Sequence, residues 1–117
     1  MREIKFRIWD KENKRFSTMA HEEKFKNVIA SENYILVGSV GITDVFGKEV
    51  FDGDIIKAER GGTSAMLIIR WNDYYNGYRA YEDKHRYGRH IALSDLDTIE
   101  VIGNVFEDEK LLEEVGA

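Results

Sequence analysis

The stretch "EVFDGDIIK" (residues 49–57) places two aspartates on either side of one glycine, between apolar residues. A calcium loop that began at Asp52 would need an acidic residue at its fifth position and Glu at its twelfth, but isoleucine and threonine stand there. A phosphate-binding loop would need several glycines leading into a helix, whereas Gly53 leads into a strand-like segment. We therefore predict a turn in which Gly53 has a positive φ and Asp52 and Asp54 cap nearby backbone N–H groups. No metal and no cofactor is expected.

Turn signals of this kind recur along the chain. The sequence has no proline, so Gly, Asn and Asp must form its turns. Clusters of these residues lie at 10–14, 44–48, 51–54, 60–63 and 72–77. We expect Gly47 to take the left-handed position of a hairpin turn and Gly103 to mark a bulge or a barrel corner. Frequent turns between short apolar runs indicate a mostly β domain.

Several segments have the composition of β-strands. Residues 4–9 place Ile4, Phe6 and Ile8 on one face, with the two-residue period of a half-buried strand. The expected strands cover residues 4–9, 34–38, 54–60, 64–71, 77–83, 89–93 and 98–106, with a Gly-Gly turn joining 54–60 to 64–71. The segment 20–33 is ambiguous, because it fits an exposed loop, a short helix or a strand.

The order of these segments narrows the architecture. In "LSDLD" (93–97), Ser94 is followed three residues later by Asp97, a pattern typical of the cap of a single helical turn. About five short strands with one helical turn before the last are the chain order of an SH3-like barrel. We predict a mostly β (α+β) fold in which an N-terminal β-meander leads into an SH3-like barrel, followed by a short helix. The expected units are residues 1–45 with an irregular 20–33 region, the barrel at 46–106 and the helix at 107–117, all in one compact unit.

The tail "EDEKLLEEVGA" (107–117) predicts a short helix with an apolar stripe formed by Leu111, Leu112 and Val115. A helix of two or three turns is marginal alone in water. We therefore expect this stripe to dock either on the barrel or on a second copy of the chain, and it is a candidate oligomer contact.

Three blocks of the sequence carry a family resemblance: "MREIKFRIWD" (1–10), "GKEVFDGDII" (47–56) and "IEVIGNVFEDEKLL" (99–112). Together they resemble the YopX family of small proteins, which bacteriophages and prophages of Gram-positive bacteria encode. The resemblance implies a mostly β protein with a barrel-like C-terminal half, in the cytoplasm of a bacterial host cell. It implies no catalytic residue and no established activity. Residues 60–90 follow the family pattern least.

Catalytic motifs are missing from the sequence. Its histidines, His21, His85 and His90, lack the HExxH spacing of zinc proteases, and no GxSxG elbow or P-loop occurs. The chain has no cysteine, which excludes disulfides and thiolate zinc sites. We therefore expect a protein that is not an enzyme.

The sequence also predicts a protein without membrane contact. Residues 1–10 alternate charged and apolar side chains, so we expect neither a signal peptide nor an anchor there. No apolar run approaches the about 18 residues that a membrane span needs.

Residues 70–90 interleave aromatic and basic side chains. The candidate binding surface comprises Trp71, Tyr74, Tyr75, Tyr78, Arg79, Tyr81, Arg86, Tyr87 and Arg89. From 57 to 90 there are seven Lys or Arg against four acidic residues, and from 91 to 117 eight acidic residues against one Lys. The chain is therefore polarised in charge, and its basic middle could pair with the acidic tail of another copy.

Three interpretations of this segment are open. The rings could stack bases of single-stranded nucleic acid while arginines neutralise phosphates. They could instead form a protein interface, where Tyr, Trp and Arg dominate, or cover a small hydrophobic core. The acidic pI of about 5.2 argues against general affinity for nucleic acid. Our hypothesis is a non-catalytic module that binds a host or phage protein, and single-stranded nucleic-acid binding through 70–90 is the alternative.

Overall fold

The computed structural model describes residues 6–17, 33–82 and 89–115, so nearly all of the ambiguous 20–33 segment lies outside the described residues. The strands are β1 (Phe6–Asp10), β2 (Arg15–Ser17), β3 (Tyr34–Thr43), β4 (Glu49–Phe51), β5 (Asp54–Arg60), β6 (Thr63–Asn72), β7 (Gly77–Tyr81), β8 (His90–Ala92) and β9 (Thr98–Asn104). A 3₁₀ turn, η1 (Leu93–Asp95), precedes β9, and the helix α2 (Glu109–Glu114) follows it.

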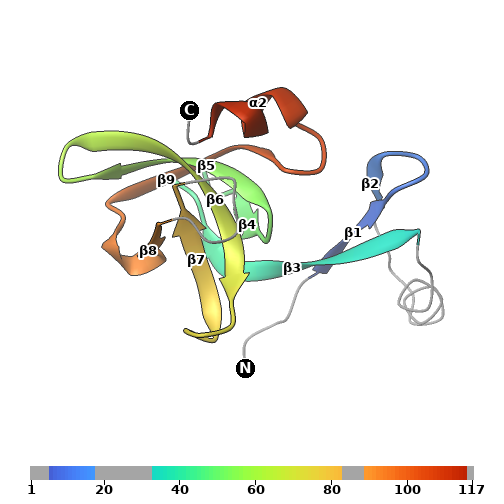
Figure 1. Cartoon of the computed structure of the whole chain (residues 1–117), viewed down its shortest axis with the longest axis horizontal. Helices are drawn as coiled ribbons and strands as arrows, with labels where there is room; N and C mark the ends of the chain where they lie inside the picture. Colours follow the sequence, from blue (N-terminus) through green and yellow to red (C-terminus); the bar gives the residue numbers. More distant parts are fainter. Residues whose placement is uncertain (1–5, 18–32, 83–88, 116–117) are drawn as a thin grey trace.

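The strands form two sheets, which Figure 1 shows as a projecting part with β1 and β2 and a curled part with β5 to β9. The first sheet has the order β2-β1-β3-β4 and the second β8-β7-β6-β5-β9. The ten-residue strand β3 takes part in both halves of the molecule. Its first half, from Tyr34 to Gly38, pairs with β1, and its second half pairs with β4. Val40 and Ile42 in that second half pack against the core of the curled sheet.

The concave face of the curled sheet encloses the main hydrophobic core. Alternate residues of β5, β6 and β7 point into it, as the two-residue period of a strand requires. Its buried members are Val50, Ile56, Ala58, Leu67, Ile69 and Ala80. The five-stranded sheet therefore behaves as a half-barrel that β4 and the second half of β3 help to close.

The convex face of the same sheet is covered by α2, which lies above it in Figure 1. Val115 has 0% exposure and packs with Ile55 and Ile68, and Leu111 and Leu112 pack against this cluster. Of the two dockings left open by the sequence, the structure shows the helix on its own sheet. Val115, a candidate oligomer contact, is therefore buried within the chain.

The glycine at 103 makes this docking fit. Ile55 pairs with Gly103 and Ile56 with Val101, so β9 has a bulge at Ile102, as expected near this glycine. A Cβ atom at Gly103 would lie 2.7 Å from the side chains of both Asp108 and Leu111. Only glycine lets the α2 region approach β9 this closely.

The structure confirms a mostly β fold with a half-barrel and a short C-terminal helix. Two short strands, β2 and β4, were not expected, and β3 is five residues longer than the 34–38 prediction. The predicted cap is wrong in detail, because η1 has no side-chain cap hydrogen bond and Asp97 instead accepts one from the N–H of Gly61. The division at residues 45/46 stays a prediction. Within the described ranges, no helix has the length and apolar character needed to cross a bilayer.

Truncation after Asp108 tests the docking of α2. It removes Val115 and uncovers Ile55 and Ile68, so the free energy of unfolding should fall by about 3 kcal/mol, the order expected for one or two buried aliphatic side chains. The oligomeric state should not change. Urea unfolding and sedimentation would measure the two effects, with truncation after Val115 as the control that retains the buried contact. Unchanged stability with a lost oligomer would instead place the stripe between two copies.

Candidate functional site

The turn Asp52-Gly53-Asp54 joins β4 to β5 and is held by backbone bonds on both sides. Gly53 has a φ of +84°, which confirms the predicted positive value. Its N–H donates to the carbonyl of Ile69 (2.8 Å) and its carbonyl accepts from the N–H of Val105 (2.9 Å). This turn is therefore a junction of β6, β9 and the first sheet, and we find no separate ligand cradle in it.

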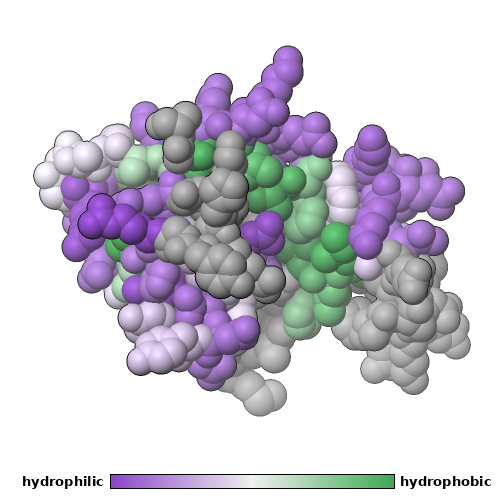
Figure 2. All heavy atoms as spheres, viewed as in Figure 1, coloured by the Kyte–Doolittle hydropathy of each residue, from purple (hydrophilic) through white to green (hydrophobic). Residues whose placement is uncertain are grey.

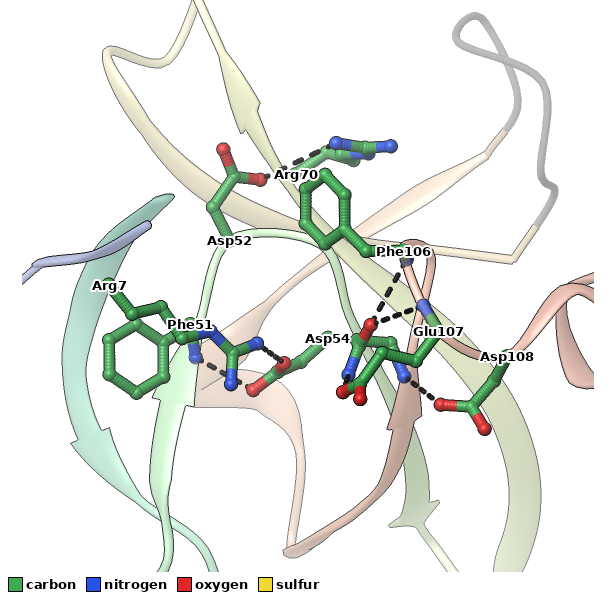
Figure 3. Close-up of polar contacts among 9 residues, drawn as sticks. Arg7, Phe51, Asp52, Asp54, Arg70, Phe106, Glu107 and Asp108 are labelled. Carbon is green, nitrogen blue, oxygen red and sulfur yellow. Dashed lines mark hydrogen bonds and ion pairs between the residues drawn. The ribbon is translucent and has the colours of Figure 1, made fainter. Parts of the chain in front are cut away.

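Asp54 is the polar centre of the junction and is almost fully buried. Its carboxylate accepts hydrogen bonds from the N–H of Phe51 (2.8 Å) and from Nη2 of Arg7 (2.8 Å), both drawn in Figure 3. Burial raises the pKa of this carboxyl above its ordinary value of 3.8, while the N–H of Phe51 and the nearby guanidinium oppose that rise. Asp54 thus has the predicted capping role, and it also forms an ion pair with Arg7.

Arg7 reaches this carboxylate from β1 between two aromatic rings. Its guanidinium carbon lies 4.0 Å from the ring centre of Phe16 and 4.3 Å from that of Phe51. Both contacts are cation–π interactions, which strengthen as water is excluded. The arrangement couples the first strand to the half-barrel across 47 residues of sequence.

Asp52 points away from this cluster. Its Oδ1 lies 3.8 Å from Nη1 of Arg70 and has no hydrogen-bond partner among the described residues. Burial raises the pKa of Asp52, and the charge of Arg70 opposes that rise. Oδ1 of Asp52 therefore caps no backbone group, while the N–H of Gly53 also opposes the rise in the pKa of this carboxyl. A second cap at Asp52 stays a prediction. Across residues 6–17, 33–82 and 89–115, no group of three His, Cys, Asp or Glu side chains could hold a metal ion.

The turn between β3 and β4 is built on Asp44. Gly47 has a φ of +80°, as predicted. The Asp44 carboxylate accepts the N–H groups of Phe46 (2.9 Å), Lys48 (2.8 Å) and, from β9, Val101 (3.0 Å). These bonds, that of Val101 above all, lower the pKa of Asp44 below 3.8. Asp44 thus ties this turn to the last strand.

The aromatic residues of the candidate surface separate into exposed and buried groups. Trp71, Tyr74 and Tyr75 have exposures of 46%, 89% and 54% around the turn between β6 and β7. Tyr78 is half-buried against the inner core. Its ring meets that of Trp71 edge-on at 5.3 Å, and the indole Nε1 of Trp71 donates to Asp73 (2.9 Å). Trp71 is therefore held in place at the surface and is not a core residue.

Of the other members of the set, two have internal partners, one is exposed, and two lie outside the described residues. The Arg79 guanidinium lies 4.2 Å from the ring centre of Tyr75, and its Nε donates to Nδ1 of His90 (3.1 Å). Tyr81 is buried, and its hydroxyl accepts from Asn72 (3.0 Å). Arg89 is exposed, and Arg86 and Tyr87 lie outside the described residues. We call Trp71, Tyr74, Tyr75 and Tyr78 the aromatic surface.

Comparison with protein families agrees with this fold. The model of the family described as "YopX protein" matches residues 11–113. The chain belongs to the YopX family. Two solved structures resemble this YopX-family chain: EF1440 from Enterococcus faecalis and YopX from Bacillus subtilis.

Both likenesses concern the fold alone. EF1440 is 20% identical, with a TM-score of 0.62 over 94% of this chain and 98% of that one. YopX is also 20% identical, with a TM-score of 0.58 over 96% of this chain and 99% of that one. A comparison with curated proteins finds no match.

The sequence did not predict two polar contacts of this YopX-family fold, the Arg7–Asp54 ion pair and the bond from the Val101 N–H to Asp44. In both cases the two residues lie far apart in sequence. The one available signal is that Asp54 directly precedes an apolar pair, at a position where a strand begins and solvent is excluded.

Two glycine substitutions separate backbone strain from packing at the Asp52-Gly53-Asp54 turn. At Gly47 a Cβ atom would meet nothing within 4 Å, whereas at Gly53 it would lie 3.0 Å from the Phe106 ring. Gly47→Ala should cost only the left-handed penalty of about 1–2 kcal/mol. Gly53→Ala should cost about 1–3 kcal/mol more, because overpacking adds to the strain. Urea unfolding of both variants measures the difference, and equal losses would show that the contact with Phe106 is easily relieved.

Proposed function

We propose that this protein is a phage- or prophage-encoded accessory protein that acts as a non-catalytic protein-binding module through the aromatic surface. The observation that carries the proposal is the exposure of Trp71, Tyr74 and Tyr75 on one turn. Aromatic side chains at such sites supply most of the energy at protein interfaces. The proposed setting is the cytoplasm of a bacterial host cell, and the proposed partner is a host or phage protein.

The geometry of Trp71 favours this role. Its bond to Asp73 and its edge contact with Tyr78 restrict the indole before any partner arrives. A side chain that is ordered beforehand loses little conformational entropy on binding. Trp71 and the neighbouring tyrosines are therefore suited to be rigid anchors for a partner surface.

Single-stranded nucleic acid fits the same residues less well. Tyr81 is buried and cannot stack on a base. Arg79 already contacts Tyr75 and His90, and the chain has a net charge of −5. Phosphate neutralisation by free Lys and Arg supplies most of the affinity for nucleic acid, so the partner that we propose is a protein.

The buried carboxylates support a non-catalytic role. Asp44 and Asp54 each accept backbone N–H groups within turns, and Asp54 also pairs with Arg7. Their hydrogen bonds hold strands together, so Asp44 and Asp54 are engaged in structural contacts and are not available as general bases.

The test is affinity capture from lysates of infected and uninfected host cells, before and after nuclease treatment. The bait is the wild-type chain, the double variant Trp71→Ala/Tyr74→Ala, or Phe46→Ala. Phe46 is a matched control, because it is an exposed aromatic (78%) on the separate turn between β3 and β4. Circular dichroism would verify that all three are folded.

A defined protein should bind the wild type and Phe46→Ala, resist nuclease, and be lost or at least tenfold weakened with the double variant, since two hot-spot residues each contribute more than about 1 kcal/mol. Capture that disappears with nuclease would favour the nucleic-acid alternative. Equal capture by all three baits would show that the aromatic surface is not the binding site.

A further inference from the structure

A groove of about 810 Å³ lies between the first sheet and the C-terminal helix, away from the aromatic surface. Its apolar floor is formed by Trp9, Phe106 and Leu111, and its rim by Lys14, Glu107, Asp108, Glu109, Lys110 and Glu114. Figure 2 shows apolar atoms between the hydrophilic atoms of α2 at the top and of the β1–β2 turn at the right. This volume lies within the range of about 300–1,000 Å³ that ligand sites occupy.

The floor is held rigidly by aromatic contacts. The Trp9 ring lies 4.9 Å from that of Phe16 and 5.5 Å from that of Phe106, and Phe16 meets Phe106 edge-on at 5.8 Å. These rings come from β1, β2 and the segment after β9. The groove is therefore preformed at the junction of the two sheets.

The rim carries four carboxylates against two ammonium groups. Two of the carboxylates are oriented by Asn104: Glu107 accepts its side-chain amide (2.9 Å) and Asp108 its backbone N–H (3.0 Å). Glu109 and Glu114 make no hydrogen bond or ion pair through their side chains within the described part of the chain. Glu114 is also in the last turn of α2, which has no basic residue to balance the helix dipole.

We propose that this groove binds a basic segment of a partner protein. Lys and Arg have an aliphatic stem and a charged end, and the groove offers an apolar floor below an acidic rim. A stem over Phe106 and Leu111 places the charged end among Glu107, Glu109 and Glu114. The complementary charges select basic partners over acidic ones.

The experiment uses Trp71→Phe protein, in which Trp9 is the single remaining tryptophan. Trp9 lines the groove, and no residue of the aromatic surface does, so Trp9 emission reports on the groove and the proposed function can fail without affecting the result. The probe is a synthetic peptide of alternating arginine and glycine, and its control carries citrulline, the neutral analogue, at every arginine. Trp9 emission at low salt reports binding.

Two double variants with equal charge change locate the site. Glu109→Gln/Glu114→Gln removes rim carboxylates, while Glu12→Gln/Glu113→Gln removes exposed carboxylates that do not line the groove. The rim variant should bind the arginine peptide roughly two- to twenty-five-fold more weakly, since each exposed ion pair changes affinity by roughly 1.4- to fivefold. The control variant should bind within twofold of the parent, and higher salt should weaken binding of the arginine peptide.

Four results would overturn the proposal. Equal binding of the citrulline peptide would remove the charge argument, and equal weakening by both double variants would indicate diffuse attraction to an acidic surface. No saturable change up to about 1 mM peptide would leave no site of useful affinity. Sedimentation without peptide tests the other possible occupant of the groove, a second copy of the chain. A dimer that the rim variant abolishes would assign the groove to that second copy.

Discussion

The guanidinium of Arg7 lies at the contact of the two sheets, bonded to the buried carboxylate of Asp54 and covered by the rings of Phe16 and Phe51. Removing one partner of a buried ion pair leaves a charge without compensation, which costs far more than the pair itself contributes. The Arg7–Asp54 pair thus specifies one arrangement of the first strand on the half-barrel. Asp54 is the first residue of β5, the strand that hydrogen-bonds to both β6 and β9.

The rest of the molecule follows from this junction. With Asp54 fixed, the neighbouring Gly53 can bond to Ile69 and Val105, and Phe106 comes to lie on Trp9. The groove beside α2 depends on this contact, because its floor includes Trp9 from the first sheet and Phe106 from the segment after β9. The aromatic surface lies on the β6–β7 turn, so the chain carries two separate surfaces of different chemistry on one rigid support.

Local sequence patterns predicted most of the half-barrel. The hairpin of β5 and β6 follows from alternating apolar residues around two glycines, and Gly61 and Gly62 both have positive φ. The docked helix α2 was predicted from an apolar stripe on a segment too short to be a stable helix alone in water. These features depend on neighbours within a few residues, where the period of the side chains is decisive.

Features that depend on distant residues could not be predicted in this way. β3 continues past Gly38 because its second half pairs with β4 and packs against the core. The local sequence "GSVGIT" (38–43) does not predict this pairing. Likewise, the aromatic–basic segment appeared to be one surface, but strand alternation and the partners of Arg79 and Tyr81 divide it. The roles of Arg7 and Asp44 are set by residues that approach only in the folded chain.

A double-mutant cycle on Arg7→Met and Asp54→Asn, followed by urea unfolding, tests most directly whether this pair joins the two halves. Contacting residues in one network couple by about 0.5–3 kcal/mol, and we expect the upper part of that range here. The comparison is the pair of the exposed Arg70 with the half-buried Asp52, whose charged groups lie 3.8 Å apart, with an expected coupling below about 1 kcal/mol. Additive losses at Arg7 and Asp54 would contradict the account, because the two halves would then be held together without this pair.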